Sequence, residues 1–161
     1  MNTTTVIKSK RSATLFDDIL LTFLITYVFA AYSYEQRLSE GFMGLWNKCM
    51  LVIFLMTWVI TAIKNGMQKK AGFALYTAVY WLLPQLIIIL FSSGPELFRH
   101  SVFMYTLSEF SLVLSTRPIE LMGGYIGITA EMSMILVLMI IFAAFFGGLA
   151  YTNDKESIKK V

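Results

Sequence analysis

Four long apolar runs constrain this chain more than any other feature of its sequence. They cover about residues 13–34, 43–63, 72–92 and 132–151. Each is close to the roughly 20 residues that an α-helix needs to cross about 30 Å of hydrocarbon. Backbone in lipid has to satisfy its own hydrogen bonds, and four runs are too few for a closed barrel. The sequence therefore predicts an all-α integral membrane protein, a single polytopic domain (1–161) with four transmembrane helices.

The composition excludes the common water-soluble classes. The chain of 161 residues is 57% hydrophobic and 14% charged, whereas soluble domains have about 25% charged and 45–50% apolar residues. A chain this short buries too small a fraction of its surface to hide so much apolar material from water. A soluble enzyme, a disordered tail and a free nucleic-acid-binding domain are excluded. The expected partners are the lipid bilayer and another integral membrane protein or a second copy of the chain, with no nucleic acid.

The first run has some features of a cleaved signal peptide. Lys8, Lys10 and Arg11 precede it, as basic residues precede the apolar core of a secretory signal. However, Asp17 and Asp18 interrupt the change from basic to apolar residues. We therefore expect this run to be retained as a membrane span.

The basic residues predict the orientation in the membrane. Nine of the thirteen Lys and Arg residues lie in the N-terminal segment, between the second and third runs, or in the C-terminal tail. If the spans alternate in direction, these three segments share one side, and the other four basic residues lie opposite. Because cytoplasmic segments carry the excess of Lys and Arg, we expect a multi-pass inner (cell) membrane protein with both termini cytoplasmic.

The outer connection before the last run is long. It contains an interfacial segment at about residues 99–122, in which residues 101–115 have helical spacing. Four apolar residues share one face: Phe103, Leu107, Phe110 and Leu114. Four serines favour another face: Ser101, Ser108, Ser111 and Ser115. This pattern predicts a short helix in the outer interface, its apolar face toward acyl chains or the helix bundle. A re-entrant hairpin is the alternative.

Two interpretations apply to the rest of this connection. Thr129 is suited to cap the last span, with Glu131 in its first turn. In the first interpretation the segment therefore serves only capping and turn formation. Alternatively, a partner recognises a shaped outer surface. Its candidate contact residues, rich in the aromatic and arginine anchors of interfaces, are Phe103, Phe110, Arg117 and Glu120.

Polar residues inside membrane spans are candidates for function. Asp18, Thr22 and Thr26 are four residues apart and form a stripe expected to face the bundle interior. Trp81 and Gln85 align in the third run in the same way. We interpret both stripes as helix-packing contacts. The alternatives are a proton or cation site at Asp18, or a transport route lined by the residues of both stripes.

The last span contains two pairs of small residues that allow close helix contact. Ala143 and Gly147 form one pair, and Ala144 and Gly148 form the other. Small residues four positions apart let two membrane helices approach closely. The predicted contact is either within the chain or with a partner.

The sequence contains no recognisable catalytic or metal-binding motif. Cys49 is the only cysteine, expected to pack among apolar side chains, and His100 is the only histidine. A His-pair metal site is therefore impossible, and no phosphate-binding glycine loop or nucleophile elbow occurs. We predict no catalytic, cofactor-binding or metal-binding residues and no enzymatic activity.

The overall plan resembles that of the immunity proteins that protect bacteria from pore-forming colicins. The string Arg117-Pro118-Ile119-Glu120-Leu121-Met122 is similar to an outer loop in that family. The resemblance concerns the fold plan and assigns no role to individual residues. The lack of reactive groups, the helix-contact motif and the aromatic outer surface together predict a non-enzymatic protein that acts by contact with another membrane protein, as in immunity or exclusion, assembly, or an accessory subunit. The alternative hypothesis is an oligomeric transporter or channel subunit for a small solute, an ion or protons.

Overall fold

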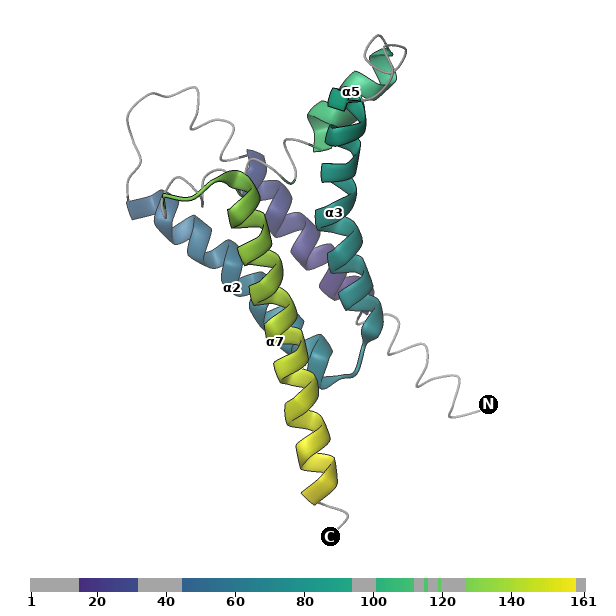
Figure 1. The fold of residues 1–161 in the computed structure, drawn as a ribbon. Helices are drawn as coiled ribbons and strands as arrows, with labels where there is room; N and C mark the ends of the chain where they lie inside the picture. The colour runs from purple at the N-terminus through teal and green to yellow at the C-terminus, as the bar shows by residue number, and fades with distance from the viewer. Residues whose placement is uncertain are drawn as a thin grey trace.

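The structure is a computed structural model that describes residues 15–31, 45–93, 101–111, 115, 119 and 127–158. These residues are helical, apart from short turns and helix ends, and contain no strand, so the prediction of an all-α fold is confirmed for them. The chain forms an N-terminal helix (residues 15–31), α2 (Leu45–Met67), α3 (Ala71–Ser93), α5 (Val102–Ser111) and α7 (Ala130–Ile158) (Figure 1).

Three of these helices are long and apolar enough to cross a membrane. The three stretches are Lys48–Met67, Ala71–Phe91 and Met132–Lys155. They coincide with the second, third and fourth apolar runs and indicate a multi-pass membrane protein. The described part of the N-terminal helix is not among them, so length and composition here establish three candidate spans rather than the predicted four.

Two helices extend beyond their apolar runs. α2 continues past residue 63 to Met67, and α7 continues past residue 151 to Ile158. The Thr152 hydroxyl of α7 donates a hydrogen bond to the Met67 carbonyl at 3.0 Å, so the ends of the two helices are connected. Apolar residues mark where a helix meets lipid, whereas helical hydrogen bonding continues into the polar residues beyond.

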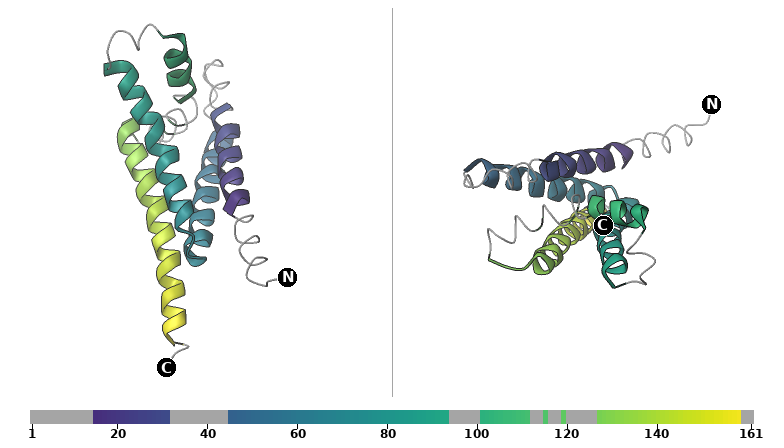
Figure 2. Two further views of the ribbon diagram at one scale, coloured as in Figure 1. Left: turned by 90° about the vertical axis from the view of Figure 1, so that its right-hand side faces the viewer. Right: turned by 90° about the horizontal axis from the view of Figure 1, so that it is seen from above.

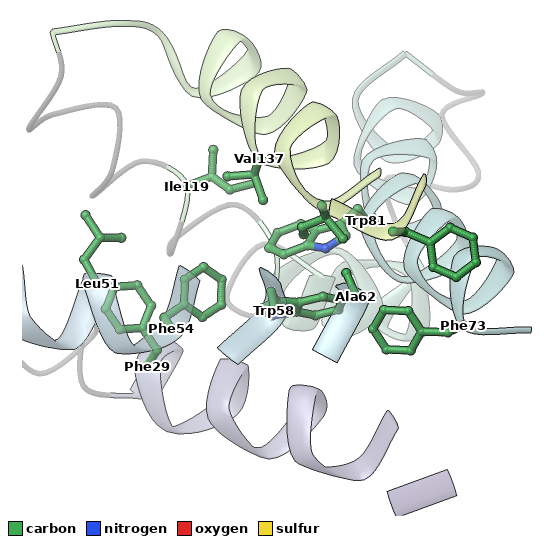
Figure 3. Close-up of a cluster of buried hydrophobic side chains, with 11 residues drawn as sticks. Phe29, Leu51, Phe54, Trp58, Ala62, Phe73, Trp81, Ile119 and Val137 are labelled. Atoms are coloured by element: carbon green, nitrogen blue, oxygen red, sulfur yellow. The ribbon is translucent and has the colours of Figure 1, made fainter. Parts of the chain in front are cut away.

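The core is built around α2. Leu51, Phe54, Trp58 and Ala62 follow one another at helical spacing and are all buried. Figure 2 shows the N-terminal helix lying along α2 on one side of the molecule, with α3 and α7 on the other. The buried cluster joins side chains from all of these elements (Figure 3): Phe29, Leu51, Phe54, Trp58, Ala62, Phe73, Trp81, Ile119, Val137, Ile141 and Phe145.

α2 and α7 approach each other closely at two glycines. A Cβ atom on Gly148 would overlap the carbonyl oxygen of Ile63, and one on Gly66 would overlap the carbonyl oxygen of Phe145. The pair Ala144 and Gly148 therefore makes its helix contact within the chain. Contact this close requires that neither helix carry a side chain at the crossing.

The other small-residue pair of α7 points away from α2. Ala143 and Gly147 are exposed, and a Cβ atom on Gly147 would meet no atom of the described structure within 4 Å. The tertiary structure thus distinguishes the two pairs: Ala144 and Gly148 lie on the side that packs on α2, whereas Ala143 and Gly147 are exposed.

The start of α7 confirms the predicted cap. The helix begins at Ala130, and the amide of Met132 donates to the hydroxyl oxygen of Thr129 at 3.3 Å. The Ser133 amide donates to the Thr129 carbonyl at 3.0 Å. Gly127 precedes this cap with φ of 75°, a conformation that glycine adopts without steric cost.

The outer surfaces of the long helices are apolar. Ile60 on α2, Leu75 on α3 and Met139 on α7 are each more than half exposed, as expected for side chains that contact lipid. Cys49 is also exposed, so the prediction that it packs inside the protein is wrong. In a bundle of few helices, much of each helix faces outward, and an apolar neighbourhood in the sequence does not place a residue in the interior.

Candidate functional site

A buried carboxylate is the centre of the polar contacts between the N-terminal helix and α2. Asp18 is buried, and its Oδ1 accepts a hydrogen bond and ion pair from Lys64 Nζ at 2.6 Å. Its Oδ2 accepts from Asn65 Nδ2 at 2.9 Å. The same amide nitrogen donates to the Thr61 carbonyl at 2.9 Å. Both carboxylate oxygens are therefore satisfied by consecutive residues of the last turn of α2.

The ion pair is unequally exposed. The Lys64 side chain is 47% exposed, whereas that of Asp18 is 5% exposed. Lys64 thus reaches from the end of the bundle to a carboxylate that is inside it. A charged donor makes this hydrogen bond stronger than a neutral one, and without it a buried carboxylate would be costly.

Asn65 contributes a second polar atom to this cluster. The residue is fully buried, and its Oδ1 has no hydrogen-bond partner among the described residues. Within the part of the chain that the structure describes, the cluster of Asp18, Lys64 and Asn65 therefore has one unpaired acceptor.

The two threonines of the predicted stripe continue this contact along the N-terminal helix. The Thr22 hydroxyl donates to the Asp18 carbonyl at 3.0 Å and lies 3.3 Å from the Tyr76 hydroxyl of α3. The Thr26 hydroxyl donates to the Thr22 carbonyl at 2.7 Å and accepts from Trp58 Nε1 at 3.0 Å. Both hydroxyls bond the carbonyl four residues back, as threonines in helices commonly do. These bonds connect three helices.

The structure brings together only part of the predicted polar set. Asp18, Thr22 and Thr26 share the buried face of the N-terminal helix, as their spacing predicts. Trp81 lies instead in the aromatic core, with its ring centre 5.6 Å from that of Trp58. Its buried Nε1 has no partner within the described residues. Gln85 is half-buried one turn farther along α3.

α5 has the opposite polarity to that of a water-soluble helix. Ser108 and Ser111 are buried, whereas Phe103 and Phe110 are 72% and 55% exposed. The alternative that its apolar face packs on the bundle is therefore wrong, because the serine face does so. Arg117 and Glu120, the other predicted contact residues of the outer segment, lie outside the described residues.

Sequence reasoning did not identify Lys64 and Asn65 as site residues. Lys64 follows the second apolar run, so in the sequence it counts only among the basic residues that predict membrane orientation. A signal was present, because antiparallel neighbouring helices place the start of one beside the end of the next. Asp18 near the start of the N-terminal helix and Lys64 near the end of α2 are at matching depths.

The described residues contain no group of three or more His, Cys, Asp or Glu side chains that would hold a metal ion. Comparison with known proteins finds no matching family, no similar curated protein and no similar solved structure. A functional proposal therefore depends on the chain's own sequence and geometry.

Proposed function

We propose that this chain is a non-enzymatic inner-membrane protein with four spans that acts by contact with another integral membrane protein. The N-terminal helix supports the fourth span by its polarity. Its buried face carries Asp18, Thr22 and Thr26, while Phe16 and Leu21 are at least half exposed. A helix in water would show the reverse pattern, whereas lipid favours apolar residues outside and paired polar residues inside.

The arrangement of the helix ends supports both termini being cytoplasmic. The Asp18–Lys64 ion pair joins the start of the N-terminal helix to the end of α2, and the bond from Thr152 to Met67 joins that end to α7. Figure 1 shows these ends at the same end of the bundle. The three segments rich in Lys and Arg all adjoin it, and such segments remain in the cytoplasm.

The single observation that carries the contact function is the uncovered stripe of α7. Ala143 and Gly147 have the spacing that lets membrane helices pack closely, and both are exposed in the structure. The neighbouring pair, Ala144 and Gly148, lies on the side of α7 that packs against α2. A helix of another protein, or of a second copy, is expected to pack there. Phe103 and Phe110, which are exposed on α5, provide a second contact at the outer end, together with Arg117 and Glu120.

The proposal is tested by enlarging the stripe. Gly147→Leu and Ala143→Leu should abolish a complex recovered in mild detergent, because the added side chains separate the two helices. Ala31→Leu is the matched control, since Ala31 is an exposed small residue on the N-terminal helix. The proposal is overturned if the wild-type chain forms no complex, or if neither α7 variant reduces it.

If a complex forms, its composition decides among the classes proposed here. Immunity or exclusion, assembly and accessory-subunit roles all require an integral membrane partner of different sequence. A complex containing only this chain would assign the stripe to a homo-oligomer.

A transporter or channel subunit is the second candidate, favoured by the buried Asp18 cluster and the unsatisfied Asn65 Oδ1. In an oligomer the route would also use Thr22, Thr26, Trp81 and Gln85. Proteoliposomes of the purified chain would then show ion, proton or solute flux that Asp18→Asn abolishes and Asp17→Asn retains. Absence of flux from the wild-type chain contradicts this candidate.

A further inference from the structure

The outer segment that contains α5 turns back toward the bundle. Both views in Figure 2 show α5 beside the end of α3 rather than extending away from it. The rings of Phe91 and Tyr105 make an edge contact with centres 6.1 Å apart. Phe91 is the last residue of the apolar stretch of α3. The first turns of α5 are therefore level with the outer end of a candidate span.

Buried positions continue beyond α5 with the period of a helix. Ser108, Ser111, Ser115 and Ile119 are each less than 5% exposed. Steps of three or four residues place all four on one helical face. The side chains of Ser111 and Ser115 donate to the carbonyls of Leu107 and Ser111 at 2.7 Å, so their hydroxyls need no water.

Ile119 lies inside the bundle. It is 2% exposed and belongs to the main buried cluster, and Figure 3 shows it beside Val137. Val137 and Leu51, another member of that cluster, both lie within candidate spans. Ile119 is therefore buried in one cluster with residues of two candidate spans, which is not expected of a connection confined to the aqueous side.

The exposed carboxylate of the segment is compatible with this depth. Glu109 lies on the exposed part of α5, ten positions before Ile119. A chain of ten residues is long enough for Glu109 to remain outside the hydrocarbon while Ile119 is within it.

We propose that the described residues of the outer segment, α5 together with Ser115 and Ile119, belong to a re-entrant insertion that enters the bundle from the outer side. Ile119 anchors the insertion against α7 and the N-terminal half of α2, and the serine face packs on the interior. The assignment of the outer side rests on the proposed topology, whereas the insertion itself does not.

The insertion is tested by cysteine chemistry in membranes, with Cys49→Ala as the background. Ile119→Cys combined with Val137→Cys should form a crosslink on mild oxidation, because both residues belong to one buried cluster. Glu109→Cys combined with Val137→Cys is the control and should not. Crosslinking does not depend on orientation, so its failure would overturn the insertion without affecting the topology.

Accessibility gives the second readout. A membrane-impermeant maleimide added from the outer side should label Glu109→Cys readily. Ser115→Cys, a nearly isosteric change at a fully buried position, should remain unlabelled until the protein is denatured, as should Ile119→Cys. Labelling of either buried position at the rate of Glu109→Cys would overturn the proposal, even if Ile119→Cys alone destabilises the fold.

Discussion

At the scale of single residues, the environment rather than the residue type decides the effect of a change. Gly147 and Gly148 are neighbours in α7 and identical in chemistry. Gly147 faces open space, whereas Gly148 is in contact with the backbone of α2. A prediction based on the small-residue motif alone treats them alike, but the structure separates them.

Gly148→Ala should strongly destabilise the protein, by about 3 kcal/mol or more, because a backbone carbonyl cannot move aside as a side chain can. Gly147→Ala should be neutral or stabilising by a few tenths of a kcal/mol to about 1 kcal/mol, since alanine has the higher helix propensity. Unfolding in mixed detergent micelles measures both. Equal effects from the two variants would contradict the close contact of α2 and α7.

The Asp18–Lys64 pair should respond asymmetrically to neutralisation. Lys64→Met leaves a buried carboxylate without its cation and should cost about 3 kcal/mol. Asp18→Asn leaves a half-exposed lysine that can turn to water, so its cost should be smaller, about 1 kcal/mol. The double variant should recover part of the loss from Lys64→Met, as measured by the same unfolding assay. A larger loss from Asp18→Asn than from Lys64→Met would contradict the unequal burial.

At the scale of secondary-structure elements, the N-terminal helix and α5 follow one rule. Each buries hydroxyl-bearing side chains, Thr22 and Thr26 in one and Ser108 and Ser111 in the other, and exposes large apolar residues such as Phe16 and Phe110. Lipid competes poorly for hydrogen bonds, so polar faces find partners inside the protein. The N-terminal helix is held in this way by Asp18, Thr22 and Thr26.

Thr26→Val should weaken the packing of the N-terminal helix on α2. Valine has a similar shape but cannot accept the hydrogen bond from Trp58 Nε1, which would be left unsatisfied in the core, at a cost of about 1–2 kcal/mol. Thr57→Val is the control, because the Thr57 hydroxyl bonds only the Ile53 carbonyl of its own helix in the described structure. Melting temperature in detergent compares the two, and a loss from Thr57→Val as large as that from Thr26→Val would refute this role.

At the scale of the whole molecule, contacts join three helix ends at one end of the bundle. There Asp18 of the N-terminal helix pairs with Lys64 of α2, and Thr152 of α7 bonds Met67 of α2. The alternation of the spans proposed above would place the basic segments of the sequence at this end. The proposed four-span topology follows from both features together.

Reporter fusions after residue 161 and before residue 1 should both report the cytoplasm. A fusion in the loop between α3 and α5 should report the opposite side, because α3 crosses once from the cytoplasmic end. Three spans instead of four would place the two termini on opposite faces, and that result would refute the fourth span. A matched fusion between α2 and α3 controls for the cytoplasmic signal.

The sequence by itself determined the features that depend on local composition and length. The apolar runs that became α2, α3 and α7, the Thr129 cap and the inward stripe of Asp18, Thr22 and Thr26 are all readable within one segment. Hydropathy, helix period and capping act over a few turns, so they do not require knowledge of neighbouring helices.

Only the tertiary structure decided which polar groups pair and which faces are covered. The partners of Asp18, the inward direction of the α5 serines and the burial of Ile119 depend on which helices are adjacent and how each is rotated. The close contact at Gly66 and Gly148 sets the position of α7 on α2, and therefore leaves Gly147 outside. Such choices arise from the mutual packing of distant segments, since backbone contact between two helices fixes the rotation of both.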